Sequence, residues 1–294
     1  MRKKLLLSGA ILALLASPFF GAYILVENRL NRTYVLPEES LTVTGDPDQV
    51  VRGEHLVTVL MGCTDCHADD LGGKFLYDDS LFGSIAGSNL TTGAGGVGGA
   101  YSVLDWERAI RHGLDQEGRP LIFVMASYYA GVGDEDVAAM IAYLRQVPPV
   151  DRALPATTIG PLTRFFILTD PHLLPAQVID HDSGHLPAPE AALTAEYGAY
   201  LATACTICHG ANFGGGLYVG SGLNLTPGGD LRDWDEGDFI TALRAGRVPD
   251  GRQLDDEKMP WKRLRGLTDD ELRAIWLHLQ SLPTVQSTPA AGGE

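Results

Sequence analysis

Two short cysteine motifs constrain this chain more strongly than any other feature of its sequence. They use all 4 cysteines and read Cys63-Thr-Asp-Cys66-His67 and Cys205-Thr-Ile-Cys208-His209. Two thiols one helical turn apart can add to the two vinyl groups of one haem, and the imidazole that follows then reaches the iron from the same face. The sequence therefore predicts two covalently bound haem c groups, attached through Cys63, Cys66, Cys205 and Cys208, with His67 and His209 as axial iron ligands.

Other roles for paired cysteines suit this chain less well. A zinc site with four cysteine ligands also uses two such pairs, but here each pair is followed by histidine and belongs to its own copy of a longer repeat. A thioredoxin-like redox pair needs a βαβ pattern around it, which this sequence lacks. A disulfide between Cys63 and Cys66 would close a strained short loop.

The sixth ligand of each iron is predicted from the repeat downstream of each motif. Arg108-Ala-Ile-Arg-His-Gly113 aligns with Thr241-Ala-Leu-Arg-Ala-Gly246, and Met125 then aligns with Met259. A thioether opposite imidazole favours reduced iron and raises the potential, which suits an electron carrier. We therefore expect Met125 and Met259 to complete the two iron spheres, with core packing as the alternative. Bis-histidine ligation is disfavoured because the remaining histidines, including His112 and His181, have no counterpart in the other half.

Two asparagines lie at equivalent places after the glycine-rich stretch that follows each motif. Ser88-Asn-Leu-Thr-Thr92 matches Leu223-Asn-Leu-Thr-Pro227. Asn89 and Asn224 are candidates for haem-pocket contacts, as donors to a haem propionate or to a loop carbonyl. A turn-forming role is the alternative for both asparagines.

Each half has the order helix, haem motif, middle helix, ligand loop and closing helix, and Thr268-Asp-Asp-Glu271 predicts a capping box at the start of the second closing helix. This organisation resembles class I cytochrome c. The runs Gly118-Arg-Pro-Leu-Ile-Phe-Val-Met-Ala-Ser and Tyr143-Leu-Arg-Gln-Val-Pro-Pro149 resemble di-haem and tri-haem cytochromes that serve membrane-bound dehydrogenases. The family's Met-Pro pair is present at Met259-Pro260, whereas Ala126 follows Met125.

The amino terminus predicts the compartment. Arg2-Lys3-Lys4 precedes an uncharged run from Leu5 to Val26, which as a helix would be roughly 33 Å long and could span a bilayer. A cleaved signal peptide is the alternative. Positive charge before the run keeps that end inside, so we expect a single anchor in a bacterial inner membrane with the haem domains in the periplasm.

The resemblance and the hydrophobic pattern together predict an all-α fold with two tandem cytochrome c-like domains and an N-terminal transmembrane helix. The predicted segments are an anchor or signal over 1–27, a linker over 28–50, cytochrome c domains over 51–150 and 196–286, a proline-rich interdomain segment over 151–195 and a disordered tail over 287–294.

The formal charge of −15 and the sequence pI near 4.8 exclude nucleic acid as a partner. An acidic surface can steer a basic redox partner, and solubility is the alternative explanation. The expected function is electron transfer between a dehydrogenase or quinol-oxidising complex and an oxidase or soluble cytochrome, at the membrane and without independent catalysis. Two alternatives are a di-haem peroxidase, which the matching methionines disfavour, and a structural haem subunit of a respiratory or photosynthetic complex.

Overall fold

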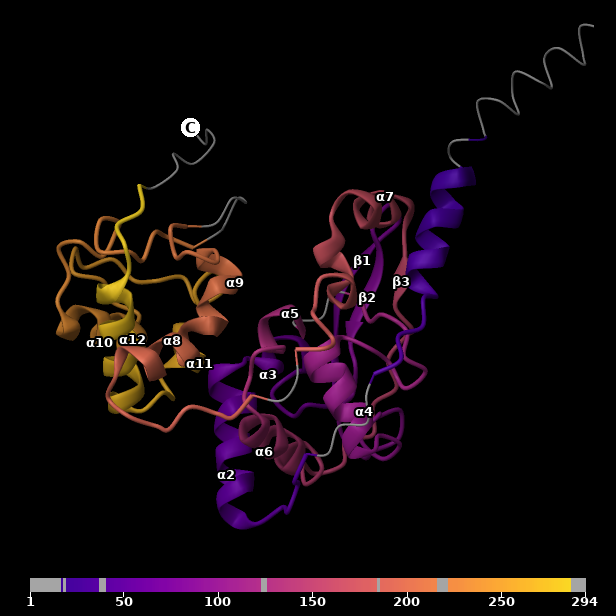
Figure 1. Ribbon diagram of the computed structural model, residues 1–294, viewed down its shortest axis with the longest axis horizontal. Helices are drawn as coiled ribbons and strands as arrows, with labels where there is room; N and C mark the ends of the chain where they lie inside the picture. The colour runs from indigo at the N-terminus through magenta and orange to yellow at the C-terminus, as the bar shows by residue number, and fades with distance from the viewer. Residues whose placement is uncertain are drawn as a thin grey trace, which may run out of the picture. The chain divides into compact units, whose positions relative to one another are not determined.

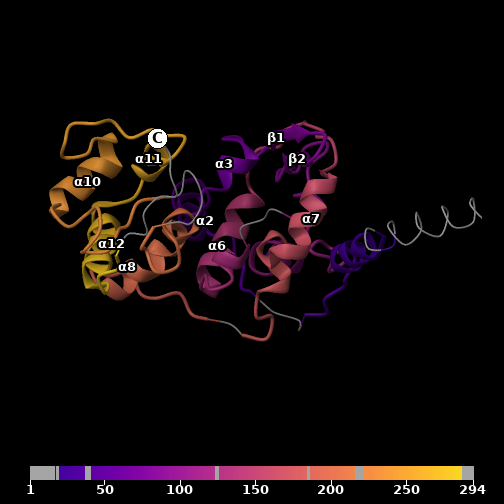
Figure 2. The same cartoon turned by 90° about the horizontal axis from the view of Figure 1, so that it is seen from above.

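The computed structural model describes residues 17, 20–36, 41–122, 126–183, 186–215 and 222–286, and two views of it are given in Figures 1 and 2. The chain forms two compact units. One unit contains the described residues of 1–40, 66–130 and 147–184. The other contains those of 41–65, 131–146 and 185–294. The predicted domain boundaries stay a prediction.

Two pairs of crossing helices organise the second of these units. Helix α2 (Pro47–His55) packs on α6 (Asp134–Leu144), and α8 (Ala195–Ala202) packs on α12 (Asp269–Ser281), as Figures 1 and 2 show. Each pair joins the first helix of a repeat to its closing helix. The unit also contains the π-helical turn η1 (Leu56–Leu60), the 3₁₀ turn η5 (Thr203–Cys205), α9 (Thr206–His209), α10 (Glu236–Ala245) and α11 (Trp261–Leu264).

A glycine permits each helix crossing. A Cβ atom on Gly53 of α2 would lie 1.9 Å from the carbonyl oxygen of Ala139, and one on Gly198 of α8 would lie 1.8 Å from that of Ala274. No side chain fits at such a distance, so the two backbones approach as closely as glycine allows. The same device at the same place in both repeats fixes how the first and closing helices cross.

Side-chain caps start the helices. Asp46 accepts from the backbone N–H of Gln49 at the start of α2. Thr268 and Glu271 form the predicted capping box of α12, which is thereby confirmed. Gly133, the N-cap residue of α6, has no side chain to make such a bond.

The first unit contains a small sheet beside its helices. Strands β1 (Lys74–Asp79), β2 (Gly83–Gly87) and β3 (Thr158–Ile159) pair antiparallel in the order β1-β2-β3. The unit also holds α4 (Val103–Glu107), the π-helical turn η2 (Arg108–His112), α5 (Ala126–Tyr129), α7 (Pro161–Thr169), η3 (Pro171–Leu173) and η4 (Pro175–Gln177). The point in the sequence where one unit gives way to the other falls within helix α3 (Cys63–His67).

The predicted all-α fold with a transmembrane helix is wrong. The run after the first haem motif contains aromatic and β-branched residues between glycines, and it forms a hairpin that a strand from the proline-rich segment then joins. Over the ranges that the structure describes, no helix is long and apolar enough to cross a membrane. Most of the predicted span Leu5–Val26, and the predicted tail, lie outside the described residues.

The described end of that span belongs to a helix over residues 20 to 30, which packs within the first unit. Val26 is buried in a cluster with Ile167 of α7 and Leu174. Arg29 donates to the carbonyl of Ile167 at 2.5 Å, and Arg164 forms an ion pair with Glu27. Part of the proline-rich segment therefore forms ordered helices and contributes to a core.

Candidate haem sites

The first haem motif forms helix α3, which places Cys63 and Cys66 one turn apart and His67 at its end. The Nδ1 atom of His67 lies 2.7 Å from the carbonyl oxygen of Ser88. A carbonyl can only accept, so Nδ1 carries the proton and Nε2 is the nitrogen with an available lone pair. Desolvation lowers the pKa of His67 and keeps the ring neutral. The ring is therefore oriented as an iron ligand requires.

The second motif repeats this arrangement. His209 ends α9, its ring is buried, and its Nδ1 atom lies 2.8 Å from the carbonyl oxygen of Leu223. Burial lowers the pKa of His209 as well. A Cβ atom on Gly222 would lie 2.4 Å from that same Nδ1 atom, so only glycine lets the chain pass behind the ring. Both histidines are thus set by a backbone carbonyl from the loop that follows their motif.

The donor set fits a covalent haem c. Cys205 and Cys208 are free thiols, and burial raises the pKa of Cys205 to about 11. Cys205 precedes α9 and Cys208 lies in its single turn, with His209 directly after. Two thiols and an imidazole nitrogen at this spacing are the groups that thioether attachment and axial ligation use.

Of the two predicted methionine ligands, the structure describes one. Met259 is half-buried and lies between a turn and Pro260, the N-cap residue of α11. Its backbone N–H donates to Asp255 at 2.9 Å, and the indole of Trp261 donates to the carbonyl of Leu254 at 3.1 Å, which holds this ligand loop closed. Met125 lies outside the described residues. Iron ligation by either methionine stays a prediction.

Asn89 connects the first haem loop to the segment after its closing helix. Its Nδ2 atom donates to the carbonyl of Val150 at 2.7 Å, while its Oδ1 atom accepts from the backbone N–H of Thr91 at 2.9 Å and from the Thr91 hydroxyl at 2.8 Å. The asparagine is buried.

Asn224 makes the same connection in the second repeat. Its Nδ2 atom donates to the carbonyl of Val285 at 2.8 Å, and its Oδ1 atom accepts from the backbone N–H and hydroxyl of Thr226 at 2.9 and 2.7 Å. Both asparagines therefore bond a loop carbonyl in the structure. A direct contact of either with a haem stays a prediction.

A buried polar cluster that sequence reasoning missed joins the two repeats. Arg52 of α2 donates through Nε and one terminal nitrogen to Asp136 of α6, both at 2.8 Å, and its other terminal nitrogen lies 3.6 Å from Glu271 of α12. His55 Nε2 lies 2.9 Å from Glu271, and the hydroxyl of Tyr200 donates to Asp136 at 2.7 Å. Both acids occupy the third position of their closing helix, and this is the signal that a sequence search could have used.

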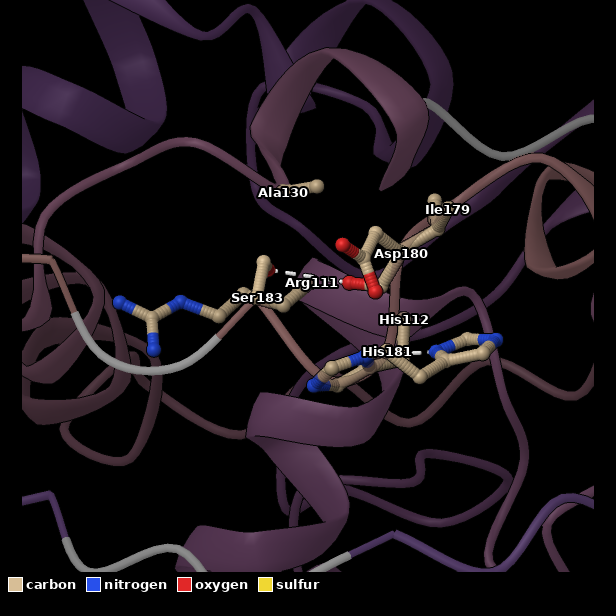
Figure 3. A pocket seen from close by; sticks show the side chains of 7 residues that line it. All are labelled: Arg111, His112, Ala130, Ile179, Asp180, His181 and Ser183. Carbon is tan, nitrogen blue, oxygen red and sulfur yellow. Dashed lines mark hydrogen bonds between the residues drawn. The ribbon is translucent and has the colours of Figure 1, made fainter.

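A small pocket lies in the first unit (Figure 3), lined by Arg111, His112, Ala130, Ile179, Asp180, His181 and Ser183. The Nδ1 atoms of His112 and His181 lie 2.8 Å apart, and Nε2 of His181 lies 2.9 Å from the carbonyl of Ala176. Since that carbonyl can only accept, His181 is protonated on Nε2, and its Nδ1 accepts from His112 in the neutral ring. Neither histidine was expected to bind iron, and the structure bonds them to each other.

In the part of the chain that the structure describes, no group of three or more acidic, histidine or cysteine side chains is placed to hold a metal ion.

Comparisons with known proteins identify the family. The model of the cytochrome c family matches residues 195–283, which cover the second repeat. A protein described as diheme cytochrome c-type, from Cereibacter sphaeroides, is 30% identical over 286 residues, which is 85% of this chain and 90% of that protein.

Two dehydrogenase subunits are also similar. The alcohol dehydrogenase (quinone), cytochrome c subunit of Gluconacetobacter polyoxogenes is 27% identical over 88% of this chain, and the match spans 63% of that protein. The fructose dehydrogenase cytochrome subunit of Gluconobacter japonicus is 30% identical over 42% of this chain, and the match spans 26% of that protein. The chain therefore matches less than two thirds of the length of either subunit.

In this chain, a backbone carbonyl orients the histidine that follows each cysteine pair. The similarity of the chain to one di-haem protein extends over most of both sequences. With covalent haem c as its cofactor and electron transfer as its chemistry, the chain belongs to the diheme c-type cytochromes.

Proposed function

We propose that the protein carries two haem c groups, one on each motif, and passes electrons from a dehydrogenase to a terminal acceptor. The observation that supports this most is the matched orientation of His67 and His209, each bonded through Nδ1 to a loop carbonyl. A histidine held in this way leaves Nε2 as the nitrogen that would bind an iron, and the bond at Nδ1 fixes the orientation of the ring. Two such sites in one chain suit the transfer of electrons from one haem to the other.

A haem held by each motif would supply an iron that takes up or gives up one electron, which is the chemistry that electron transfer needs. The residues of the chain fix where this happens. The cysteines would hold the cofactor covalently, His67 and His209 would bind the irons, and the loop that contains Met259 would offer a thioether to the second iron.

A dehydrogenase is the proposed electron donor. Its support is the similarity to cytochrome subunits of alcohol and fructose dehydrogenases. The acceptor is proposed to be an oxidase or a soluble cytochrome. The formal charge of −15 suits a partner with a basic docking face.

The proposed location of the haem domains is the bacterial periplasm. Arg2-Lys3-Lys4 ahead of an apolar run has the charge pattern of an export signal. Haem attachment through cysteine also suits a compartment outside the cytoplasm.

Haem content and electron delivery test this proposal. Denaturing mass spectrometry of the mature protein should give the chain mass plus two haems. The double variants C63S/C66S and C205S/C208S should each lose one haem and retain the other, so each serves as the control for its counterpart. The purified holoprotein should then be reduced by a quinone-linked dehydrogenase plus its substrate. One haem in the unaltered protein, or no reduction of a two-haem protein, would contradict the proposal.

A further inference from the structure

The helix over residues 20–30 carries apolar side chains beyond the side that it buries. Val26 is 1% exposed and packs with Ile167 of α7 and with Leu174. Tyr23 and Leu25 of the same helix are 50% and 57% exposed. A helix with apolar side chains on its buried and its exposed surface is normally covered on both. The exposed surface of this helix therefore requires a further partner.

Exposed aromatic rings continue this surface over α7 and the turn between β1 and β2. Phe165 and Leu81 are both 55% exposed. The ring of Phe166, which is also exposed, lies 5.9 Å from that of Phe165 and stacks on Phe82 at 6.2 Å. The exposed ring of Tyr77 meets Phe82 edge-on at 6.0 Å. The rings of α7 and of the hairpin therefore form one connected group.

These elements are fixed to one another within the first unit. Arg164 of α7 forms an ion pair with Glu27, and its guanidinium carbon lies 5.0 Å from the centre of the Tyr23 ring. The carbonyl of Phe82 accepts from the Thr163 hydroxyl at 2.7 Å. The helix over residues 20–30, α7 and the β1–β2 hairpin therefore lie together, as Figures 1 and 2 show. We refer to their exposed apolar side chains as the aromatic face, whose main members are Phe20, Tyr23, Tyr77, Leu81, Phe165 and Phe166.

The aromatic face gathers most of the apolar exposure of the protein. Most of the large apolar side chains that are exposed in the described ranges belong to the helix over residues 20–30, to the β1–β2 hairpin or to α7. Single exposed apolar residues are common on soluble proteins, whereas a contiguous group of them marks an interaction surface. The face is therefore built to dock on something apolar.

The chain that leads into the aromatic face indicates what covers it. Residues 5–19 carry no charged side chain and are mostly apolar, and the continuous described chain begins at Phe20, on the face itself. An apolar sequence of this length avoids water, and covalent continuity puts its end beside the face. One apolar medium therefore adjoins both, and a lipid bilayer is such a medium.

The charges at the face suit lipid headgroups without net charge. Glu27 is neutralised by Arg164, and the carboxylate of Asp79 accepts from the backbone N–H groups of Leu81 and Phe82 at 2.7 and 3.0 Å. Aromatic rings and arginine stems favour the boundary between headgroups and acyl chains. The formal charge of −15 disfavours an anionic surface. A zwitterionic lipid surface therefore fits best.

We propose that the aromatic face docks the first unit on the surface of a zwitterionic bilayer, with its rings at the headgroup boundary and no part of the face crossing the bilayer. This inference goes beyond the proposed function, because it depends neither on haem nor on the identity of the electron donor. The competing occupant of the face is a protein, including a second copy of this chain, and the experiment below distinguishes the two.

Spin labels on the full-length holoprotein bound to phosphatidylcholine vesicles test the proposal. L81C and F165C place a nitroxide on the face. E117C is the matched control, because Glu117 is 65% exposed and lies in the same unit but belongs to none of the three elements. The ratio of collisions with oxygen to collisions with a water-soluble nickel chelate should be at least roughly threefold higher at positions 81 and 165 than at 117, because oxygen concentrates in lipid and the chelate stays in water.

The two collision partners distinguish the two occupants. Lipid raises the collisions with oxygen and lowers those with nickel, whereas a protein that covers the face lowers both. Equal ratios at the three positions in vesicle-bound protein, or lowered collisions with both partners at 81 and 165, would overturn the inference.

Sedimentation with the same vesicles gives an independent measure. L81D/F165D places two charges on the face, and the control V51D/L193D places the same charges on exposed apolar residues of the second unit. The lipid concentration for half-binding should rise by roughly tenfold or more for L81D/F165D and change by less than about twofold for the control. If the unaltered protein does not bind the vesicles, or if the two variants bind equally well, the inference is wrong.

Discussion

Replacing Tyr200 by phenylalanine should destabilise the protein by removing one hydroxyl from the polar cluster between the repeats. The hydroxyl donates to Asp136 at 2.7 Å and accepts from the backbone N–H of Gly133 at 3.1 Å. In α12 the corresponding N–H, that of Thr268, donates directly to Glu271 at 2.8 Å. Aspartate is one methylene shorter than glutamate, and the Tyr200 hydroxyl bridges the same two groups at the start of α6.

The magnitude follows from what the variant leaves behind. Asp136 is 4% exposed, and it would keep both bonds from Arg52 but lose its third donor. The N-cap N–H of Gly133 would lose its acceptor. A hydrogen bond to a charged group contributes about 1.5–3 kcal/mol, so Tyr200→Phe should lower the free energy of unfolding by about 2 kcal/mol. Burial and the nearby Asp136 raise the pKa of Tyr200, so its hydroxyl is protonated as a donor at neutral pH.

Denaturant unfolding of the ferric holoprotein at pH 7, followed by helical circular dichroism, measures this free energy. Tyr143→Phe is the matched control, because Tyr143 lies on α6 and its hydroxyl bonds to none of the described residues. An equal loss in the two variants, or a loss below about 0.5 kcal/mol for Tyr200→Phe, the range of ordinary surface substitutions, would refute the bridging role.

Three further predictions concern the helix starts, the helix crossings and the iron. Burial would raise the pKa of Glu271, but bonds from His55 and Thr268 and the charge of Arg52 hold this pKa below its ordinary value of 4.5. The ionised form of Glu271 therefore stabilises the fold above pH 4.5. This contribution is lost as the pH falls through the lower pKa of the folded state. Unfolding free energies between pH 3 and 6 should accordingly fall less steeply for Glu271→Gln than for the unaltered protein, and parallel curves would contradict this. Gly198→Ala should cost about 1–3 kcal/mol by overpacking the α8–α12 crossing, measured by thermal unfolding, and an unchanged midpoint would show that the helices can separate. Met259→His should lower the potential of one haem by on the order of 0.1 V and leave the other nearly unchanged, as measured by spectroelectrochemistry; if both potentials and the sulfur-to-iron charge-transfer band persist, Met259 is not a ligand.

Local patterns in the sequence predict the parts of this protein that local interactions build. The spacing Cys-x-x-Cys-His fits within a single helical turn, so the α3 and α9 motifs are visible in the sequence. The capping box at Thr268 involves residues three apart and is equally local. The alignment of the two halves also placed the asparagines of both haem loops together, and the structure gives them matching bonds.

Features that join distant segments were not predicted. Strand β3 has two residues and lies in a proline-rich segment, so no alternation of apolar residues marks it, and its pairing with β2 depends on the fold. The bond from Asn89 reaches Val150, far along the chain, and its acceptor is a backbone carbonyl that any residue would provide. Because every residue has a backbone carbonyl, the residue type does not reveal this acceptor. The sequence therefore left a haem propionate and a loop carbonyl equally open as the partner of this asparagine.

The polar cluster also joins the first and closing helices of both repeats within the second unit. Tyr200, from the second repeat, bonds the acid of the first closing helix, and His55, from the first repeat, bonds the acid of the second. Each repeat thus supplies the donor that the other needs, while Arg52 reaches both acids. A buried carboxylate without its donors is strongly destabilising, so neither closing helix is satisfied by its own repeat alone. This exchange of donors therefore couples the α2–α6 pair to the α8–α12 pair within the second unit.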